Sequence, residues 1–228
     1  MSLFVEHQEI VVPGQKLAEG EYKAGDGTFQ EENLIFSSYV GLALVRDKKI
    51  HVRPLKGNYA AAVGDMVIGY IEDVMLTSWI VNIDGPYSGV LLASNAIRGR
   101  FDPIRDDARR IYDTGDVIRA EIISFDRTRD PQLVTKYHGL GKLRGGRVLE
   151  TNPNHIPRII GKKGSMISMI KRETNCKIIV ARNGRVWIKG ENPESEEKVI
   201  QAINQISREA HVSGLTDRIA KFLSQENN

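Results

Sequence analysis

The sequence contains a single cysteine, Cys176, in 228 residues. One thiol excludes a disulfide within the chain and any metal site built from several cysteines. The five histidines are scattered and show no metal-ligand spacing. We therefore expect no metal or other cofactor, and a fold held together by its hydrophobic core.

Long apolar runs are also missing, since the longest fall far short of a membrane span. The first residues, MSLFVEHQEIVVPG, lack the basic segment and apolar segment of a secretory signal. With 41% hydrophobic and 27% charged residues, the composition is that of an ordinary globular protein. We expect a cytoplasmic protein without a membrane partner, long enough for two to three small domains.

The net charge is only +3, but the positive charge is concentrated in one segment. Residues 141–190 carry 12 Lys and Arg against 2 Asp and Glu, whereas the regions before and after carry an excess of acids. A segment this basic favours a polyanionic partner. The alternative is a solvated charged face, because basic surface stretches are common.

Two β-rich regions come first in the chain. Residues 1–62 contain short strand-like runs separated by turn signals such as Gly-Asp-Gly and Arg-Asp-Lys-Lys, which predicts a small all-β domain. Residues 63–143 contain five strand-like runs with a long polar connection between the third and the fourth. A Gly-Asp turn is predicted to open the first and fourth of these strands. Five strands in this arrangement are the plan of an OB barrel.

Residues 144–228 change to a mixture of helices and strands. A short strand is followed by two short helical patterns, a hairpin that turns at Asn183-Gly184, and a helix that begins near Pro193 with acids in its first turn. A further short helix is expected at the end. The order β-α-α-β-β-α predicts an α+β domain, so the fold class is mainly β with a C-terminal α+β domain.

The sequence Gly161-Lys162-Lys163-Gly164 lies between the two helical patterns, inside the basic segment. Glycine has no Cβ, so a nucleic-acid backbone can approach the main chain closely. N–H groups at the start of the second helix favour a phosphate, and the lysines add positive charge. A Gly-x-x-Gly loop that clamps single-stranded nucleotides is the device of KH modules. The alternative is a capping turn, with Gly161 as the C-cap.

Bases would lie in a groove between the second helix and the strand beside it. The predicted RNA-binding residues around the loop are Arg158, Ile160, Met166, Ile167, Ile178 and Val180. Most of these Ile and Met side chains belong to the core under either interpretation of the loop.

Longer stretches resemble known families. The segment IPRIIGKKGSMISMIKRETNCKIIVARNGRVWIKG resembles a type I KH domain. VGDMVIGYIEDVMLTSWIVNIDGPYSGVLLAS, with TGDVIRAEIISFD further on, resembles an S1-type RNA-binding domain. VVPGQKLAEGEYKAGDGTF and VRPLKGNYAAAVGDMVIG resemble the archaeal exosome cap subunits of the ribosomal-RNA-processing protein four type. The resemblance covers essentially the whole chain, with the domains in the order of that family.

This resemblance implies a non-catalytic RNA-binding subunit. In the family, three copies form a trimeric cap on a hexameric ring of two phosphorolytic-nuclease-like proteins. The N-terminal domain, residues 1–62, would dock on the ring. The S1 domain, 63–143, would surround the pore, and the KH domain with a helical extension, 144–228, would lie outside it. The cap recruits single-stranded RNA and directs its 3′ end into the pore for 3′-to-5′ degradation and processing.

The S1-like segment departs from its family at the positions that stack on bases. Many S1 domains have aromatic residues on the second strand and a histidine on the third. This chain has Trp79 and Ile80 at the former positions and Leu92 at the latter. The stacking platform is therefore reduced to Trp79, with Tyr87 as a second candidate. The alternative for Trp79 is a place in the barrel core.

Arginines would then carry more of the RNA binding on this domain. The candidates are Arg98 and Arg100 in the long connection, and Arg127 and Arg129 in the turn after the fourth strand. Acidic residues lie near all four in the sequence. Surface ion pairs are therefore the alternative role.

Two other functions stay open. Polynucleotide phosphorylase carries KH and S1 modules behind two large catalytic domains, for which this chain has no room. We find no Ser/His/Asp or Cys/His arrangement, which leaves a nuclease built on scattered aspartates as the enzymatic alternative, and we predict no catalysis. The second alternative is a transcription or translation factor that binds single-stranded RNA. Bacterial factors of that kind usually have two KH domains, whereas this chain has one Gly-x-x-Gly loop.

Overall fold

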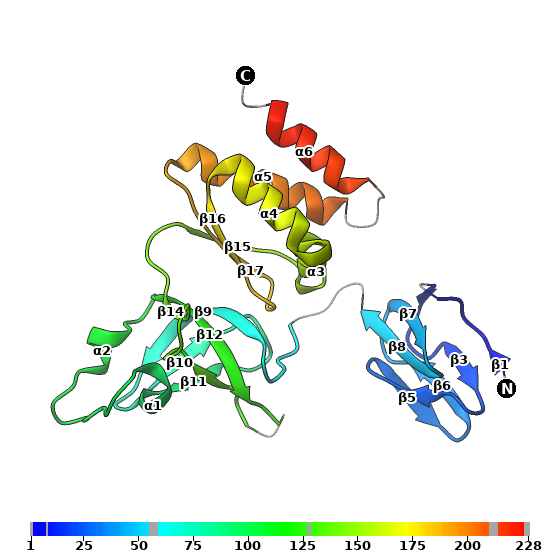
Figure 1. Ribbon diagram of the computed structural model, residues 1–228. Coiled ribbons are helices and arrows are strands. Elements are labelled where there is room, and N and C mark those ends of the chain that lie inside the picture. The colour runs from blue at the N-terminus through cyan, green and yellow to red at the C-terminus, as the bar shows by residue number, and fades with distance from the viewer. Residues whose placement is uncertain (1, 8, 55–58, 127–128, 210–213, 226–228) are drawn as a thin grey trace. The chain divides into compact units, whose positions relative to one another are not determined.

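The chain folds into two compact units, shown as a computed structural model in Figure 1. The structure describes residues 2–7, 9–54, 59–126, 129–209 and 214–225. The first unit spans Met1–Gly57 and the second spans Asn58–Asn228. Each has its own hydrophobic core, and the second unit contains two main core clusters, one in a barrel and one in an α+β domain.

All regular elements described in the first unit are strands, which form two four-stranded sheets. One sheet has the order β1-β3-β6-β5, with bounds Ser2–Leu3, Lys16–Glu19, Leu34–Ser37 and Thr28–Glu31. The other has the order β2-β7-β8-β4, with bounds Ile10–Val11, Gly41–Arg46, Lys49–Pro54 and Lys23–Ala24. Buried and partly exposed residues alternate along β6, as expected of a strand with one face on a core. The predicted all-β character is confirmed.

The predicted turns of this unit have the backbone angles that such turns need. The β7–β8 hairpin turns at Asp47 and Lys48, whose φ angles are 46° and 60°. These positive values match the tight hairpin turns that fit the twist of a β-ribbon. At Gly27, φ is 73° and a Cβ would lie 2.2 Å from the Val52 carbonyl oxygen, so only glycine fits there.

The second unit begins with a closed five-stranded barrel. Its strands, in chain order, are β9 (Met66–Val74), β10 (Ser78–Asn82), β11 (Gly89–Leu92), β12 (Val117–Ser124) and β13 (Gln132–Val134). They pair in the order β9-β10-β11-β13-β12 and back to β9, while the short β14 (Gly141–Lys142) adds to β12. This is the predicted OB-type plan.

The long connection between the third and fourth barrel strands carries two short helices, α1 (Ala93–Ala96) and α2 (Ala108–Ile111). The turns before β9 and β12 contain the predicted Gly-Asp pairs, and Gly64 and Gly115 have φ angles of 89° and 87°. Tyr59 packs in the barrel core although it precedes residue 63. The domain limits at residues 62 and 143 stay predictions.

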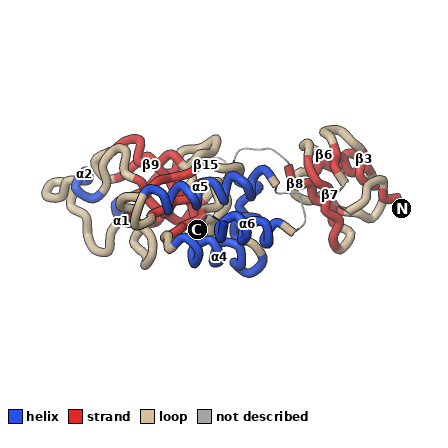
Figure 2. Tube along the Cα trace, turned by 90° about the horizontal axis from the view of Figure 1, so that it is seen from above, coloured by secondary structure: helices blue, strands red, loops and turns tan. Residues whose placement is uncertain are grey.

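The α+β domain has the predicted element order. Its elements are β15 (Arg147–Glu150), the 3₁₀ turn η1 (Pro153–His155), α3 (Ile156–Ile160), the 3₁₀ turn η2 (Lys162–Gly164), α4 (Ser165–Thr174), β16 (Lys177–Val180), β17 (Arg185–Lys189), α5 (Pro193–Arg208) and α6 (Leu215–Gln225). The sheet order is β15-β17-β16. Helices α4, α5 and α6 pack against one another, as Figures 1 and 2 show. Their inward residues share one core cluster with the sheet.

The turn between β16 and β17 also joins the α+β domain to the barrel. Asn183 is fully buried, and its Nδ2 donates to the carbonyls of Ile68 and Ile83, both at 2.8 Å. Its Oδ1 accepts the N–H of Ile68 at 3.2 Å. The side-chain amide therefore behaves as an additional peptide group beside β9, and it satisfies backbone groups that burial would otherwise leave unpaired.

Arg185, the first residue of β17, adds a second polar connection while only 3% exposed. Its guanidinium donates to the Asn82 carbonyl at 2.7 Å and to the Asn82 Oδ1 at 2.8 Å. It also lies 4.7 Å from the centre of the Tyr70 ring. Ile68 packs with Ala181 and Trp187 in a small apolar cluster beside it. Barrel and α+β domain thus form one compact unit.

Among the helices in the described ranges, none has both the length and the apolar character required to cross a membrane.

Candidate nucleic-acid interface

The Gly-Lys-Lys-Gly segment forms a tight elbow between α3 and α4. Gly161, Lys163 and Gly164 have φ angles of 75°, 53° and 80°. The N–H of Gly161 donates to the Pro157 carbonyl at 3.0 Å, and the N–H of Gly164 donates to the Gly161 carbonyl at 3.2 Å. Three positive φ values within four residues reverse the chain and separate the two helices, as the glycines predicted.

The two glycines serve different purposes. A Cβ on Gly161 would lie 2.7 Å from the Met166 Cβ and 2.8 Å from the Met166 nitrogen, so the space there is already filled. At Gly164 the nearest atom to such a Cβ is the Ser168 Oγ, 4.0 Å away. Gly161 is therefore required by packing as well as by φ. Gly164 is required by φ and leaves open surface that another backbone can approach.

Lys162 and Lys163 are both exposed. No hydrogen bond or ion pair to either side chain is found among the described residues. Both lysines come just before α4 in the chain, a ten-residue helix whose N-terminal dipole end also attracts anions. The elbow thus presents two cations to solvent just before the N-terminus of a helix, which suits a phosphate.

The groove residues divide into surface and core. Arg158 is exposed, and Ile160, Ile167 and Val180 are half-buried. Met166 and Ile178 are only 4% and 3% exposed and belong to the domain core. The prediction that these two contact RNA is corrected, because Met166 lies beneath Gly161 and Ile178 faces inward from β16.

Trp79 is a core residue of the barrel. It is fully buried, its Nε1 donates to the Tyr112 carbonyl at 2.8 Å, and its ring meets the Tyr112 ring edge-to-face at 5.5 Å. The prediction that Trp79 stacks on a base is therefore wrong, and its alternative role holds. Tyr87 is half-buried against Phe125 at 5.2 Å, while Leu92 is 37% exposed.

The candidate arginines of the barrel do not form one group. Arg98, Arg100 and Arg129 are exposed, and Arg127 lies outside the described residues. Arg98 Nε donates to the carbonyl of Lys136, just after β13, whereas Arg129 precedes the start of β13. These two arginines therefore lie at opposite ends of that strand.

Surface ion pairs do not account for the three candidate arginines that the structure describes. Arg105 and Arg110 pair with Asp102 and Asp107 at 3.9 and 4.0 Å. In the described part of the chain, the guanidinium groups of Arg98, Arg100 and Arg129 have no carboxylate within ion-pair distance. Each stays a predicted RNA contact.

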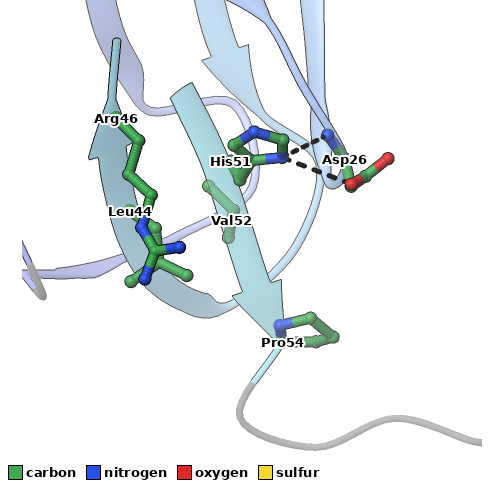
Figure 3. A pocket seen from close by; sticks show the side chains of 6 residues that line it. All are labelled: Asp26, Leu44, Arg46, His51, Val52 and Pro54. Atoms are coloured by element: carbon green, nitrogen blue, oxygen red, sulfur yellow. Dashed lines mark hydrogen bonds and ion pairs between the residues drawn. The ribbon is translucent and has the colours of Figure 1, made fainter. Parts of the chain in front are cut away.

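The first unit contains a pocket of about 390 Å³ lined by Asp26, Leu44, Arg46, His51, Val52 and Pro54 (Figure 3). His51 Nδ1 accepts the N–H of Asp26 at 3.1 Å and lies 3.3 Å from the Asp26 carboxylate. No hydroxyl or thiol is among these lining side chains, so the pair has no nucleophile to activate. Across the described ranges, no three His, Cys, Asp or Glu side chains are placed to hold a metal ion.

Sequence reasoning missed the roles of Asn183 and Arg185 at the domain junction. The available signal was Arg185, a charged residue at the start of the strand-like run RVWIK, whose next three residues are all apolar. It also missed Tyr137, which is 56% exposed beside Lys136. Only the pairing of two distant strands shows that this tyrosine lies close to the segment that carries Arg98.

Comparisons with known families match both ends of the chain. The family model of the KH domain matches residues 147–205. The family model described as the exosome RNA binding protein RRP4 N-terminal domain matches residues 8–56.

Relatives of similar length match nearly the whole chain. The exosome complex component Rrp4 of Thermococcus kodakarensis is 46% identical over 224 residues, which are 97% of this chain and 87% of that protein. The corresponding protein of Methanothermus fervidus is 44% identical over 221 residues, 97% of each chain. A crystal structure described as an exosome complex RNA-binding protein matches with a TM-score of 0.71 and 40% identity, over 75% of this chain and 98% of that one.

An OB-type barrel joined to a KH domain with an exposed Gly-x-x-Gly elbow defines a protein built from nucleic-acid-binding modules. Its N-terminal β unit and its close relatives narrow that class to one family. The chain belongs to the family of the exosome complex component Rrp4. The family resemblance read from the sequence is confirmed.

Proposed function

We propose that this chain is the non-catalytic RNA-binding cap subunit of an exosome. It binds single-stranded RNA and directs the 3′ end of that RNA to a ring of nucleases for degradation or processing in the cytoplasm. Its relatives are named exosome complex components, and a similar crystal structure is described as an exosome RNA-binding protein.

The observation that carries RNA binding is the exposed elbow at Gly161–Gly164. Two lysines that no described side chain neutralises flank open main chain at Gly164. A phosphate can approach the main chain there, at the positive end of the α4 dipole, while the ammonium groups balance its charge. Arg158 and the half-buried Ile160 adjoin the elbow and would extend the contact to a neighbouring nucleotide.

The N-terminal unit would supply the contact with the ring. Its described surface exposes several large apolar side chains: Leu3, Phe4, Ile10, Val12, Phe29, Tyr39 and Val40. Exposed apolar side chains of this kind are candidates for a surface that a protein partner covers. We propose that three copies dock through this unit on a hexameric ring of two phosphorolytic-nuclease-like subunits.

The elbow is tested by the double variant Lys162→Glu/Lys163→Glu, with binding of a labelled single-stranded RNA measured over a range of salt concentrations. Loss of two phosphate contacts is expected to lower the slope of log affinity against log salt by about 1.4 for a single strand. Affinity should fall at least tenfold at low salt. Unchanged affinity and slope would show that the elbow does not bind RNA.

A matched control is Lys23→Glu/Lys49→Glu in the first unit. These lysines lie opposite each other on β4 and β8, so the double change replaces one like-charged pair by another. It alters the net charge of the chain by the same amount as the double change in the elbow. Its RNA affinity should stay close to that of the native chain. An equal loss in both double variants would mean that overall charge, not the elbow, determines binding.

The cap assignment is tested by co-expression with ring nucleases and imaging of the particle. Three copies on one face of the ring are expected. Capture of RNA polymerase without ring subunits would favour the transcription-factor alternative. Purified chain incubated with labelled RNA, phosphate and magnesium should leave the RNA intact, and shortening would contradict the non-catalytic role.

A further inference from the structure

Tyr137 lies at the end of the barrel where two distant segments come together. Strand β11 pairs in parallel with β13, with Val90 opposite Gln132 and Leu91 opposite Leu133. Parallel strands leave a sheet at the same end. The connection that begins after Leu92 and the turn that begins after Val134 are therefore neighbours, although about 40 residues separate them in the sequence.

Hydrogen bonds hold these two segments against each other. The N–H groups of Thr135 and Lys136 donate to the Asn95 carbonyl at 2.9 and 3.1 Å. Lys136 Nζ donates to the Ser94 carbonyl at 3.0 Å, and Arg98 Nε donates to the Lys136 carbonyl at 2.8 Å. Hydrogen bonds to main-chain carbonyls thus hold the segment that contains Arg98 against the segment that contains Lys136.

The turn at residues 137–140 presents the Tyr137 ring outward. The N–H of Leu140 donates to the Tyr137 carbonyl at 3.2 Å, and Gly139 has a φ of 78°, which closes the turn. Arg119 donates to the Gly139 carbonyl at 3.2 Å from the barrel side. With 56% of its surface exposed, Tyr137 is the most exposed aromatic residue among those described in the second unit. An exposed aromatic ring on a hydrogen-bonded turn is available for stacking.

The surroundings of the ring are cationic. Arg98 and Arg100 are exposed, and Lys136 precedes Tyr137 in the chain. The segments 93–101 and 135–142 contain no Asp or Glu. Aromatic rings set among basic residues are the arrangement by which proteins bind single-stranded nucleic acid, because bases stack on the rings while cations follow the phosphates.

We propose that Tyr137 stacks on one base of single-stranded RNA while Arg98, Arg100 and Lys136 contact the adjoining phosphates. This subsite takes the role that the buried Trp79 cannot play. It rests on the proposed RNA-binding function and adds a second contact on the barrel. Because every base has a stacking face, the subsite has little sequence preference.

The test measures binding of the full chain to a short fluorescein-labelled oligouridylate. Tyr137→Ala is expected to weaken binding about tenfold with an unchanged salt slope, because a lost stacking contact carries no charge. Tyr137→Phe keeps the ring and should bind like the native chain. Tyr39→Ala is the matched control, since Tyr39 is an aromatic residue of similar exposure, 52%, in the first unit.

An abasic oligonucleotide of equal length separates stacking from charge. Native chain and Tyr137→Ala should bind it equally, because no base is present to stack. A Tyr137→Trp variant adds a direct readout: its fluorescence should be quenched by oligouridylate, whereas Trp79 and Trp187 are buried and should respond little. Equal binding of oligouridylate by native chain and Tyr137→Ala, or absence of quenching, would overturn the proposal.

Failure of this proposal differs from failure of the proposed function. If Tyr137→Ala binds RNA normally while the Lys162/Lys163 variant does not, the barrel subsite is wrong and the elbow stands. If the native chain binds no RNA, both are wrong. Weaker association of Tyr137→Ala with ring subunits, with RNA affinity unchanged, would assign this surface to a protein partner and overturn the stacking role.

Discussion

The elbow at Gly161–Gly164 and the barrel surface around Tyr137 present positive charge in different ways. The elbow consists of four consecutive residues, and its glycines determine its shape locally. The barrel surface depends on Arg98 and Lys136, which are 38 residues apart in the sequence and meet because two strands run in parallel. A site formed by consecutive residues can therefore be predicted from the sequence. A surface formed by distant segments can be located only once the tertiary structure is known.

Both surfaces belong to one unit because the β16–β17 turn joins the barrel, and Asn183→Ala tests that junction. The change leaves the N–H and carbonyl of Ile68 and the carbonyl of Ile83 without this partner. We expect the free energy of unfolding to fall by about 2–4 kcal/mol, since each buried unpaired group is costly. Urea unfolding followed by hydrogen exchange should show the barrel and the α+β domain separating.

The control for the junction is Asn204→Ala, because Asn204 is exposed on α5. Its stability should change by no more than about 0.5 kcal/mol. A single cooperative transition for Asn183→Ala, at native stability, would show that the two domains are coupled by other contacts.

The two glycines of the elbow should differ when each is changed to alanine. Gly161→Ala places a Cβ 2.7 Å from Met166 at a positive φ, so we expect a loss of about 2–3 kcal/mol in unfolding free energy. Gly164→Ala meets open space and should lose only about 1 kcal/mol, from its φ alone.

RNA binding by the same two variants sharpens the comparison. Gly164→Ala should weaken RNA binding while most stability remains, because its Cβ occupies the surface that a phosphate would approach. Thermal unfolding and RNA titration measure the two effects separately. Equal stability losses at both positions would contradict the different packing of the two glycines.

Trp79→Phe compares a buried aromatic residue with the exposed Tyr137. The substitution removes the hydrogen bond from Nε1 to the Tyr112 carbonyl and leaves space in the barrel core. We expect a loss of about 1–2 kcal/mol in stability and no change in RNA affinity. Tyr137→Ala should show the reverse pattern. A large loss of RNA affinity in a folded Trp79→Leu variant, which removes the ring, would restore the stacking role of Trp79.

The smallest effect is expected from single arginines at the two ends of β13. Arg100→Gln should lower the salt slope of RNA binding by about 0.7, as removal of one phosphate contact does on a single strand. Arg129→Gln, at the other end of the strand, should lower the slope by less than Arg100→Gln, because the proposed stacking subsite lies around Tyr137. The opposite result would place the RNA near the β12–β13 connection instead of near Tyr137.

Prediction from sequence succeeded where the signal was local. Alternating apolar residues, Gly-Asp turns and the Pro193 helix start were sufficient for the strands, the barrel plan and the α+β order, because side-chain periodicity follows from strand and helix geometry. The elbow was also predicted, since the chain needs glycine at two positions with positive φ.

Prediction failed where the direction of a side chain depended on packing. Trp79 was open to two roles because an aromatic residue on a strand fits either face, and only the position of Tyr112 inside the closed barrel decided between them. Met166 and Ile178 were assigned to a groove that their burial excludes. The sequence also did not show that Arg98 and Arg129 lie at opposite ends of β13, because strand pairing decides which end of a strand each connection reaches.

The sequence by itself determined the family, the order of the three folded regions and the charged elbow. These depend on residue order, local backbone angles and composition. Only the tertiary structure decided that an asparagine amide and a buried guanidinium join the α+β domain to the barrel, and that Arg98 bonds the carbonyl of Lys136, the residue before Tyr137. Those contacts arise from strand pairing and burial between residues that are tens of positions apart. The local sequence around a residue does not show which distant residue it will contact.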